Sequence, residues 1–152
     1  MSLINNLCER LVRHPKRVVF PEGNDARILQ AARKFASKGL GIPILLGNRL
    51  EIKTIATRLD IKLDNIRVIN HLESEDRAQF KQILKSIKRF ESYSEKDLES
   101  VLNNASYFAS LMLASSQADA LVAGANSHAE SALRPLLQII PFQDATNLIS
   151  SL

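Results

Sequence analysis

The sequence predicts an α/β fold in three layers: a parallel β-sheet with helices on both faces. Short apolar runs of four or five residues alternate along the chain with longer stretches in which apolar residues recur at helical spacing. This alternation is typical of parallel sheets, because each pair of parallel strands needs a crossover connection, usually a helix. The 152 residues suffice for one domain with a substantial core.

Four apolar runs are the expected strands. The first ends at Pro21-Glu22-Gly23 and the second at Gly47-Asn48, and both endings consist largely of residues that favour turns. The runs are rich in Val, Ile and Leu, as in strands that are buried on both faces. The expected strands cover residues 17–20, 42–46, 66–69 and 119–123.

Helical patterns fill the segments between and after these strands. Asn24 or Asp25 is the expected cap of the first helix, and Gly39 follows its end. Ser94 stands three residues before Asp97, which is the spacing of a capping box at the start of a long helix. The apolar patterns run over residues 28–36, 50–59, 75–90, 98–113 and 127–140.

The last helix carries a polar stripe. Ser127 precedes Glu130 by three residues, so a capping box is expected to start the helix at Ser127. Ser127, Ser131, Arg134 and Gln138 then share one face. A helix N-terminus with hydroxyls and a guanidinium suits an anion. The alternative is an ordinary solvated helix face, on which Arg134 pairs with Glu130 of its own helix.

Composition and charge disfavour several classes of partner. The net charge of +4 comes from basic residues spread along the chain, only 5% of residues are aromatic, and no nucleic-acid-binding motif is present. No apolar stretch has the length of a membrane span, and no secretory signal precedes the first strand. The single Cys8 fits a reducing compartment. We therefore expect a cytoplasmic protein that contacts neither nucleic acid nor membrane.

No metal site is expected. A metal centre needs several His, Cys, Asp or Glu side chains at ligand spacing, and the histidines here are isolated from one another and from cysteine. They are His14, His71 and His128.

Three segments resemble the phosphate acetyltransferase (phosphotransacetylase) and phosphate butyryltransferase family. Residues 17–32, with the sequence RVVFPEGNDARILQAA, are similar to the opening of that family. Residues 42–48 (IPILLGN) resemble its next motif, and residues 119–140, from DALVAGA through Arg134-Pro135 to LQII, resemble its central motif. The motifs occur in the family order, and the resemblance covers about residues 5–152.

The resemblance implies a reaction in which acetyl-CoA and phosphate give acetyl phosphate and CoA. Coenzyme A is then a substrate, and no permanently bound cofactor is expected. In the family a carboxylate takes the proton of the CoA thiol, and cationic and hydroxyl groups hold the phosphoryl end. The family base lies beyond this chain, so the catalytic residues are unknown here.

The substrate-binding residues expected in this chain lie mainly in the central motif. Arg134 matches the family arginine that contacts substrate in the interdomain cleft. Ser127 and His128 stand where the family has His-Ser-Thr or His-Ser-Ser, so the histidine is moved by one place. Ser131 shares the polar stripe with Arg134. Lys88 aligns with a second family arginine. Lysine keeps the charge of that residue but not its bidentate geometry.

Family members are about twice as long as this chain and fold as two α/β domains. The resemblance therefore implies an N-terminal domain over residues 1–143 and the start of a second domain at 144–152. The 152-residue chain alone is expected to be inactive. Family members are commonly homodimers, and the sequence leaves the oligomeric state open. The alternatives are a non-catalytic module that binds CoA or phosphate, and a fragment of a butyryltransferase-type enzyme.

Overall fold

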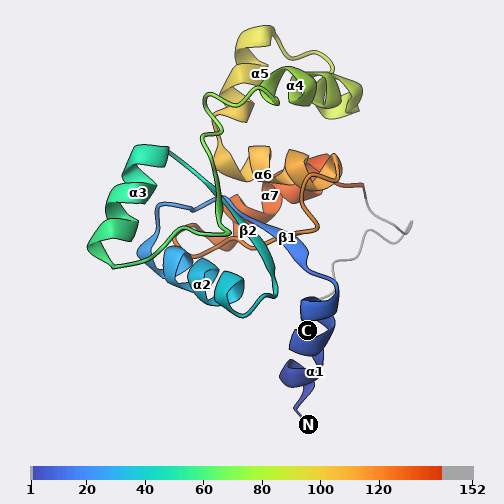
Figure 1. Cartoon of the computed structure of the whole chain (residues 1–152). Helices are drawn as coiled ribbons and strands as arrows, with labels where there is room; N and C mark the ends of the chain where they lie inside the picture. Colours follow the sequence, from blue (N-terminus) through green and yellow to red (C-terminus); the bar gives the residue numbers. More distant parts are fainter. Residues whose placement is uncertain (1, 142–152) are drawn as a thin grey trace.

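The structure is a computed structural model, and it describes residues 2–141 (Figure 1). The elements alternate as the sequence predicts, after one additional helix at the start. In order they are α1 (Leu3–Arg13), β1 (Lys16–Phe20), α2 (Ala26–Ser37), β2 (Gly41–Leu46), α3 (Arg49–Arg58), β3 (Arg67–Ile69), α4 (Arg77–Ser86), the 3₁₀ turn η1 (Lys88–Phe90), α5 (Glu95–Leu102), α6 (Ala105–Ala114), β4 (Ala120–Leu121) and α7 (Ala129–Ile139).

The four strands form one sheet in the order β3-β2-β1-β4, and every neighbouring pair is parallel. Val19 of β1 is in register with Ile44 of β2 on one side and with Leu121 of β4 on the other. The chain leaves β1 toward β2 and β3 and later returns to the other side of β1. The boundary between β1 and β4 is therefore a topological switch point, where open α/β sheets commonly bind ligands at the carboxyl ends of the strands.

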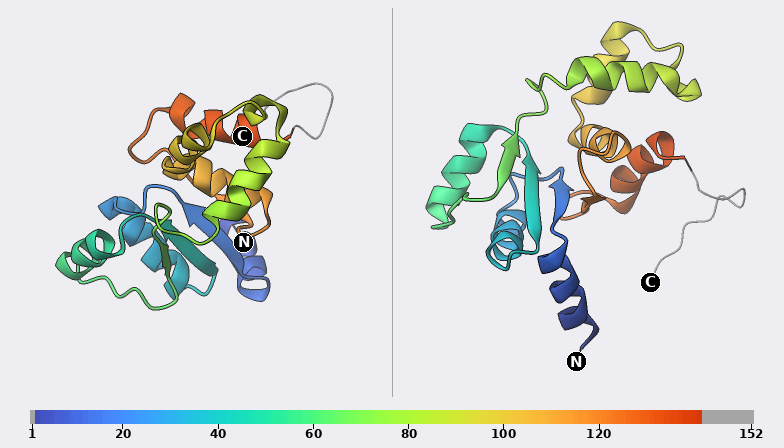
Figure 2. Two further views of the ribbon diagram at one scale, coloured as in Figure 1. Left: turned by 90° about the horizontal axis from the view of Figure 1, so that it is seen from above. Right: turned by 45° about the vertical axis from the view of Figure 1, so that its right-hand side comes forward.

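Helices cover both faces of this sheet, which confirms the predicted fold class (Figure 2). Val18 and Phe20 of β1 belong to a buried cluster with α2 and α3. Val19, which points to the opposite face, belongs to a second cluster with α4 to α7. The α4–α5 pair extends away from the sheet beyond α6, and α1 projects from the other end of the molecule (Figure 1).

The helix expected over residues 75–90 is shorter and broken. It ends at Ser86, Ile87 is extended, and η1 follows. The turn places Phe90, which is 1% exposed, edge-on against the rings of Tyr93 and Tyr107. Burial of this aromatic side chain offsets the loss of helical hydrogen bonds.

The long helix expected through residue 113 is two helices. Asn103 ends α5, and the side chain of Asn104 accepts a hydrogen bond from the backbone N–H of Ser106 at the start of α6. Asparagine competes with helical hydrogen bonds and favours caps. The expected capping box of Ser94 and Asp97 is present at the start of α5, so that part of the prediction is confirmed.

The expected start of the last helix is wrong. Among the described residues, α7 begins at Ala129, its N-cap is His128, and no side chain caps it. The box would need the Glu130 carboxylate to reach back to Ser127, but that carboxylate is paired with Arg134. The strand before it is also shorter than expected, because only Ala120 and Leu121 are paired as a strand.

Within residues 2–141, no helix is both long enough and apolar enough to cross a membrane. The second domain expected to start at residue 144 lies outside the described residues.

Candidate functional site

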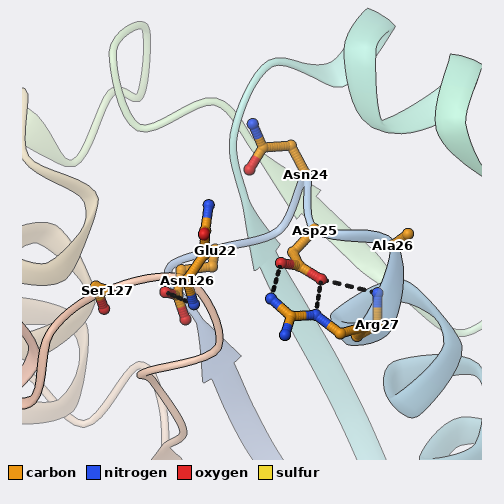
Figure 3. Close-up of a pocket in the computed structure, with 7 residues that line it drawn as sticks. All are labelled: Glu22, Asn24, Asp25, Ala26, Arg27, Asn126 and Ser127. Carbon is orange, nitrogen blue, oxygen red and sulfur yellow. Dashed lines mark hydrogen bonds and ion pairs between the residues drawn. The ribbon is translucent and has the colours of Figure 1, made fainter.

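A polar pocket of about 490 Å³ lies at the switch point between β1 and β4. The loop after β1 forms one side, and the loop between β4 and α7 forms the other (Figure 3). The two loops are about a hundred residues apart in sequence but meet at the carboxyl ends of adjacent parallel strands. The lining residues are Glu22, Asn24, Asp25, Ala26, Arg27, Asn126 and Ser127.

Asp25 and Arg27 form the helix side of the pocket. The Asp25 carboxylate caps α2 by accepting the Arg27 backbone N–H at 2.8 Å, as the sequence predicts. The Arg27 guanidinium pairs with the same carboxylate at 2.7 Å and donates to the carbonyl oxygen of Ala125 at 2.5 Å. These contacts with Arg27, above all the guanidinium hydrogen bonds, lower the pKa of Asp25 to about 2.

Glu22 spans the two loops. One carboxylate oxygen accepts the backbone N–H groups of Gly124 at 2.9 Å and Ala125 at 2.8 Å, and the other accepts that of Asn126 at 2.7 Å. Burial alone would raise the pKa of Glu22, but these N–H groups and a hydrogen bond from the Ser127 side chain together hold it below its ordinary value. Glu22 is therefore ionised and fully engaged at neutral pH.

Gly124 allows this arrangement because its φ is +101°. Residues with a side chain rarely adopt that conformation, whereas glycine adopts it readily. The turn of the backbone at Gly124 lets three successive N–H groups converge on one carboxylate.

A second bridge ties the same strands together at the opposite end. Asp119, just before β4, accepts the backbone N–H of Arg17 at 2.8 Å and two guanidinium N–H groups of Arg17 at 2.9 and 3.1 Å. These hydrogen bonds lower the pKa of Asp119 to about 2, and those from the Arg17 guanidinium have the largest effect. The β1–β4 boundary is thus fixed at both ends, which keeps the pocket loops in register.

Acid is expected to weaken the fold in a window set by Asp25 and Asp119. Both carboxyl groups have an ordinary pKa of 3.8 and a pKa of about 2 in the folded protein. A pKa that is lower in the folded state adds stability above the unfolded value, and this stability is lost as the pH falls through the folded value. Urea unfolding should therefore give a free energy of unfolding that drops between about pH 4 and about pH 2.

The control for this acid effect is Asp119→Asn, which removes one of the two groups. Its unfolding free energy should be lower at neutral pH and should change less between about pH 4 and pH 2 than that of the unmodified chain. An equally steep fall in both proteins would contradict the assignment to Asp119.

The structure separates the predicted binding residues into two places. Ser127 lies at the switch-point pocket, and His128 follows it at the exposed start of α7. Ser131 and Arg134 lie one turn and two turns further along the helix, where they line a second hollow of about 370 Å³ next to Tyr107. The polar stripe thus leads from the pocket along α7.

Arg134 forms an ion pair with Glu130, and its side chain remains 58% exposed. This is the contact that the solvated-face alternative expects. Lys88 is exposed on η1, while its neighbour Arg89 lines a groove with Arg134. The basic residue that the fold brings near Arg134 is therefore Arg89. Gln138 completes the stripe by accepting a hydrogen bond from the Tyr107 hydroxyl at 2.6 Å.

Sequence reasoning missed how Glu22 and Arg27 connect the two loops. A carboxylate beside a helix start fits simple capping, and that interpretation holds for Asp25 only. The partners of Glu22 are backbone N–H groups more than a hundred residues away, and backbone groups leave no residue pattern. Within the described part of the chain, no group of three or more His, Cys, Asp and Glu residues could hold a metal ion.

The fold and the pocket define a doubly wound α/β protein with a polar site at its switch point. The chain belongs to the family described as Phosphate acetyl/butaryl transferase, which its sequence matches over residues 2–152. This confirms the resemblance seen in the three sequence motifs.

Curated relatives carry the name phosphate acetyltransferase. The protein from Staphylococcus aureus (strain N315) is 33% identical over 139 residues, which make up 91% of this chain and 42% of the relative. The protein from Helicobacter pylori (strain J99) is 34% identical over 151 residues, or 99% of this chain and 29% of the relative. The chain thus spans less than half the length of these relatives.

Solved structures show the same fold. A phosphotransacetylase from Streptococcus pyogenes superposes with a TM-score of 0.84 at 30% identity, over 91% of this chain and 43% of that one. The EutD phosphotransacetylase from Staphylococcus aureus gives a TM-score of 0.80 at 30% identity, over 92% and 43%. The coverage fits the N-terminal domain of the two-domain phosphotransacetylase fold.

Proposed function

We propose that this chain forms the N-terminal wall of the active site of a phosphate acetyltransferase. Family membership and the named relatives support the reaction class. The observation that carries the proposal is the pocket at the β1–β4 switch point, where the two strand-end loops of the family motifs meet. Phosphate and acetyl-CoA are the proposed substrates, and the cytoplasm, which supplies both, is the proposed compartment.

The proposed chemistry is acyl transfer between a thioester and phosphate. A phosphate oxygen attacks the thioester carbonyl, the C–S bond breaks, and the CoA thiolate leaves and takes up a proton. This chain supplies cations and hydroxyls: Arg134 and Ser131 along α7, and Ser127 at the pocket. These groups suit an anionic phosphoryl end, and Arg89 adds a second guanidinium beside Arg134. We assign no general base to this chain.

Two assays test the proposal. A polypeptide of residues 1–152 should make no acetyl phosphate from acetyl-CoA and phosphate, because a general base alone contributes ~10²–10⁴-fold and substrate positioning contributes more. A chimera in which this chain replaces the matched segment of the S. aureus relative should restore the reaction. A chimera that folds but stays inactive, while the 152-residue chain still binds CoA, would favour the non-catalytic binding module.

The gene sequence after Leu152 also distinguishes the enzyme from the non-catalytic binding module. A reading frame that continues into a second domain with a catalytic aspartate supports the enzyme. A stop codon supports the binding module.

Activity of the chimera with acetyl-CoA, propionyl-CoA and butyryl-CoA tests the butyryltransferase alternative.

Arg134→Ala should abolish phosphate binding with little effect on stability. An exposed ion pair between residues four apart on a helix contributes about 0.3–0.5 kcal/mol, so the free energy of unfolding should change by less than about 1 kcal/mol. Phosphate binding to the unmodified chain should be no tighter than about millimolar, because half a cleft leaves the anion exposed. NMR shifts of the backbone amides from Asn126 to Ser131 report the binding.

Two matched variants sharpen the Arg134 test. Arg134→Lys should recover part of the binding, because lysine keeps the charge but not the forked geometry. Glu130→Gln removes the partner that Arg134 has in this structure and should tighten phosphate binding. Unchanged shifts on phosphate addition, together with a large loss of stability in Arg134→Ala, would assign Arg134 a structural role.

A further inference from the structure

Side chains that follow β1 bind the backbone of the loop between β4 and α7. Glu22 accepts the N–H of Ala125, and Arg27 donates to the carbonyl oxygen of the same residue at 2.5 Å. Both polar backbone groups of Ala125 are therefore bound by side chains that follow β1. The Gly124 and Asn126 N–H groups are bound by Glu22 as well. The path of the chain into Ser127 and α7 depends on these contacts.

We infer that Glu22 is a positioning residue of the acyl-transfer site: it holds the β4–α7 loop so that Ser127 and the polar face of α7 stand ready for substrate. The inference rests on the proposed function. Both carboxylate oxygens of Glu22 are occupied by backbone N–H groups, so Glu22 acts through the loop and does not touch substrate. The other charged groups lining the pocket are Asp25 and Arg27, which are paired with each other.

The geometry requires a carboxylate of this length. Glutamine has one acceptor oxygen, so Glu22→Gln must place its amide NH₂ group against at least one backbone N–H donor. Aspartate keeps two acceptor oxygens but is one methylene shorter, about 1.5 Å, so Glu22→Asp cannot reach all three N–H groups at 2.7–2.9 Å. Glu22 is only half-buried and belongs to neither hydrophobic cluster, so both variants should fold.

Hydrogen exchange and ligand titration on the 152-residue chain test the inference. In Glu22→Gln the amides of Gly124, Ala125 and Asn126 should exchange at least about tenfold faster than in the unmodified chain. Shifts at Ser127 and Ser131 on adding CoA or inorganic phosphate should require at least about tenfold more ligand. Glu22→Asp should recover part of both effects. Glu51→Gln is the matched control, because the Glu51 carboxylate, at the same end of the sheet, accepts a hydrogen bond from the Asn24 side chain and none from the β4–α7 loop in the described part of the chain.

Each outcome decides something different. Faster exchange with weaker binding, in Glu22→Gln but not in Glu51→Gln, supports the positioning role. Faster exchange with unchanged binding overturns it and leaves Glu22 a structural residue. Unchanged exchange also overturns it, because the loop would then not depend on the carboxylate. Failure of the unmodified chain to bind either ligand contradicts the proposed function itself, and the substrate role of Glu22 with it.

Discussion

Phe108→Ala is expected to lower the free energy of unfolding by about 3–5 kcal/mol. Phe108 lies on α6, is 0% exposed, and packs edge-on against Phe80 with ring centroids 4.8 Å apart. Its ring also lies 6.0 Å from that of His71, at the point where the chain passes from β3 to α4. The truncation removes contacts that join the sheet, α4 and α6, and leaves a cavity that these rigid elements fill poorly.

Urea unfolding measured against a matched surface variant checks this result. Leu133→Ala removes an apolar side chain from α7 that is 45% exposed, so its effect should stay within about 1 kcal/mol. Phe108→Leu keeps most of the volume and should cost about half as much as Phe108→Ala. Equal losses in Phe108→Ala and Leu133→Ala would contradict the placement of Phe108 at the centre of the core.

The sequence predicted the fold class well, because the periodicity of apolar residues and the alternation of strands with helices can be read locally along the chain. Four apolar strands that alternate with helices predict a parallel sheet, and the structure has one. The errors occur at the ends of elements, chiefly of helices. The break at Asn103 and Asn104 had a visible signal, since two successive asparagines favour a cap over a helix interior. The break at Ile87 had none, because it depends on the burial of Phe90 against distant rings.

The site was less predictable than the fold. Ser127 and Arg134 were predicted because the residues themselves carry the chemistry, and their substrate role stays a prediction. Asp25 was predicted as a cap because capping is local, and the structure confirms the cap. The role of Glu22 could not be predicted, because its three partners are backbone groups of a loop far along the chain. The 3₁₀ turn at residues 88–90 places Arg89 in the groove with Arg134, and a regular helix pattern cannot give the position of this turn. The substrate role of Lys88 stays a prediction.

The two pocket loops are held in different ways. The loop after β1 is tied down by its own sheet contacts, because the Gly23 N–H donates to the carbonyl oxygen of Leu46 at 3.1 Å. The loop after β4 is in turn tied to the first loop by Glu22 and Arg27. The contact of Gly23 with β2 therefore fixes the position of Glu22, and Glu22 in turn fixes the loop that leads into α7.

Gly23→Ala should disrupt the contact between the loop after β1 and strand β2. A Cβ at position 23 would lie 2.5 Å from the carbonyl oxygen of Leu46 and 2.9 Å from the Cβ of Leu45, distances that intact structures do not tolerate. Both neighbours belong to β2, which is paired on each side and cannot yield. Overpacking of this kind typically costs about 1–3 kcal/mol, and the loop must move away from the sheet to relieve it.

Gly23→Ala should slow acyl transfer by the chimeric enzyme although the domain still folds. A displacement of about 1 Å at a positioning group can cost about 10²-fold in rate, so the chimeric enzyme carrying the variant should lose that much activity while the domain still folds. Gln30→Ala is the control, because Gln30 is exposed on α2 and does not line the pocket. Normal activity in Gly23→Ala, with accelerated hydrogen exchange at Gly124 to Asn126, would show that the order of the second loop does not limit acyl transfer.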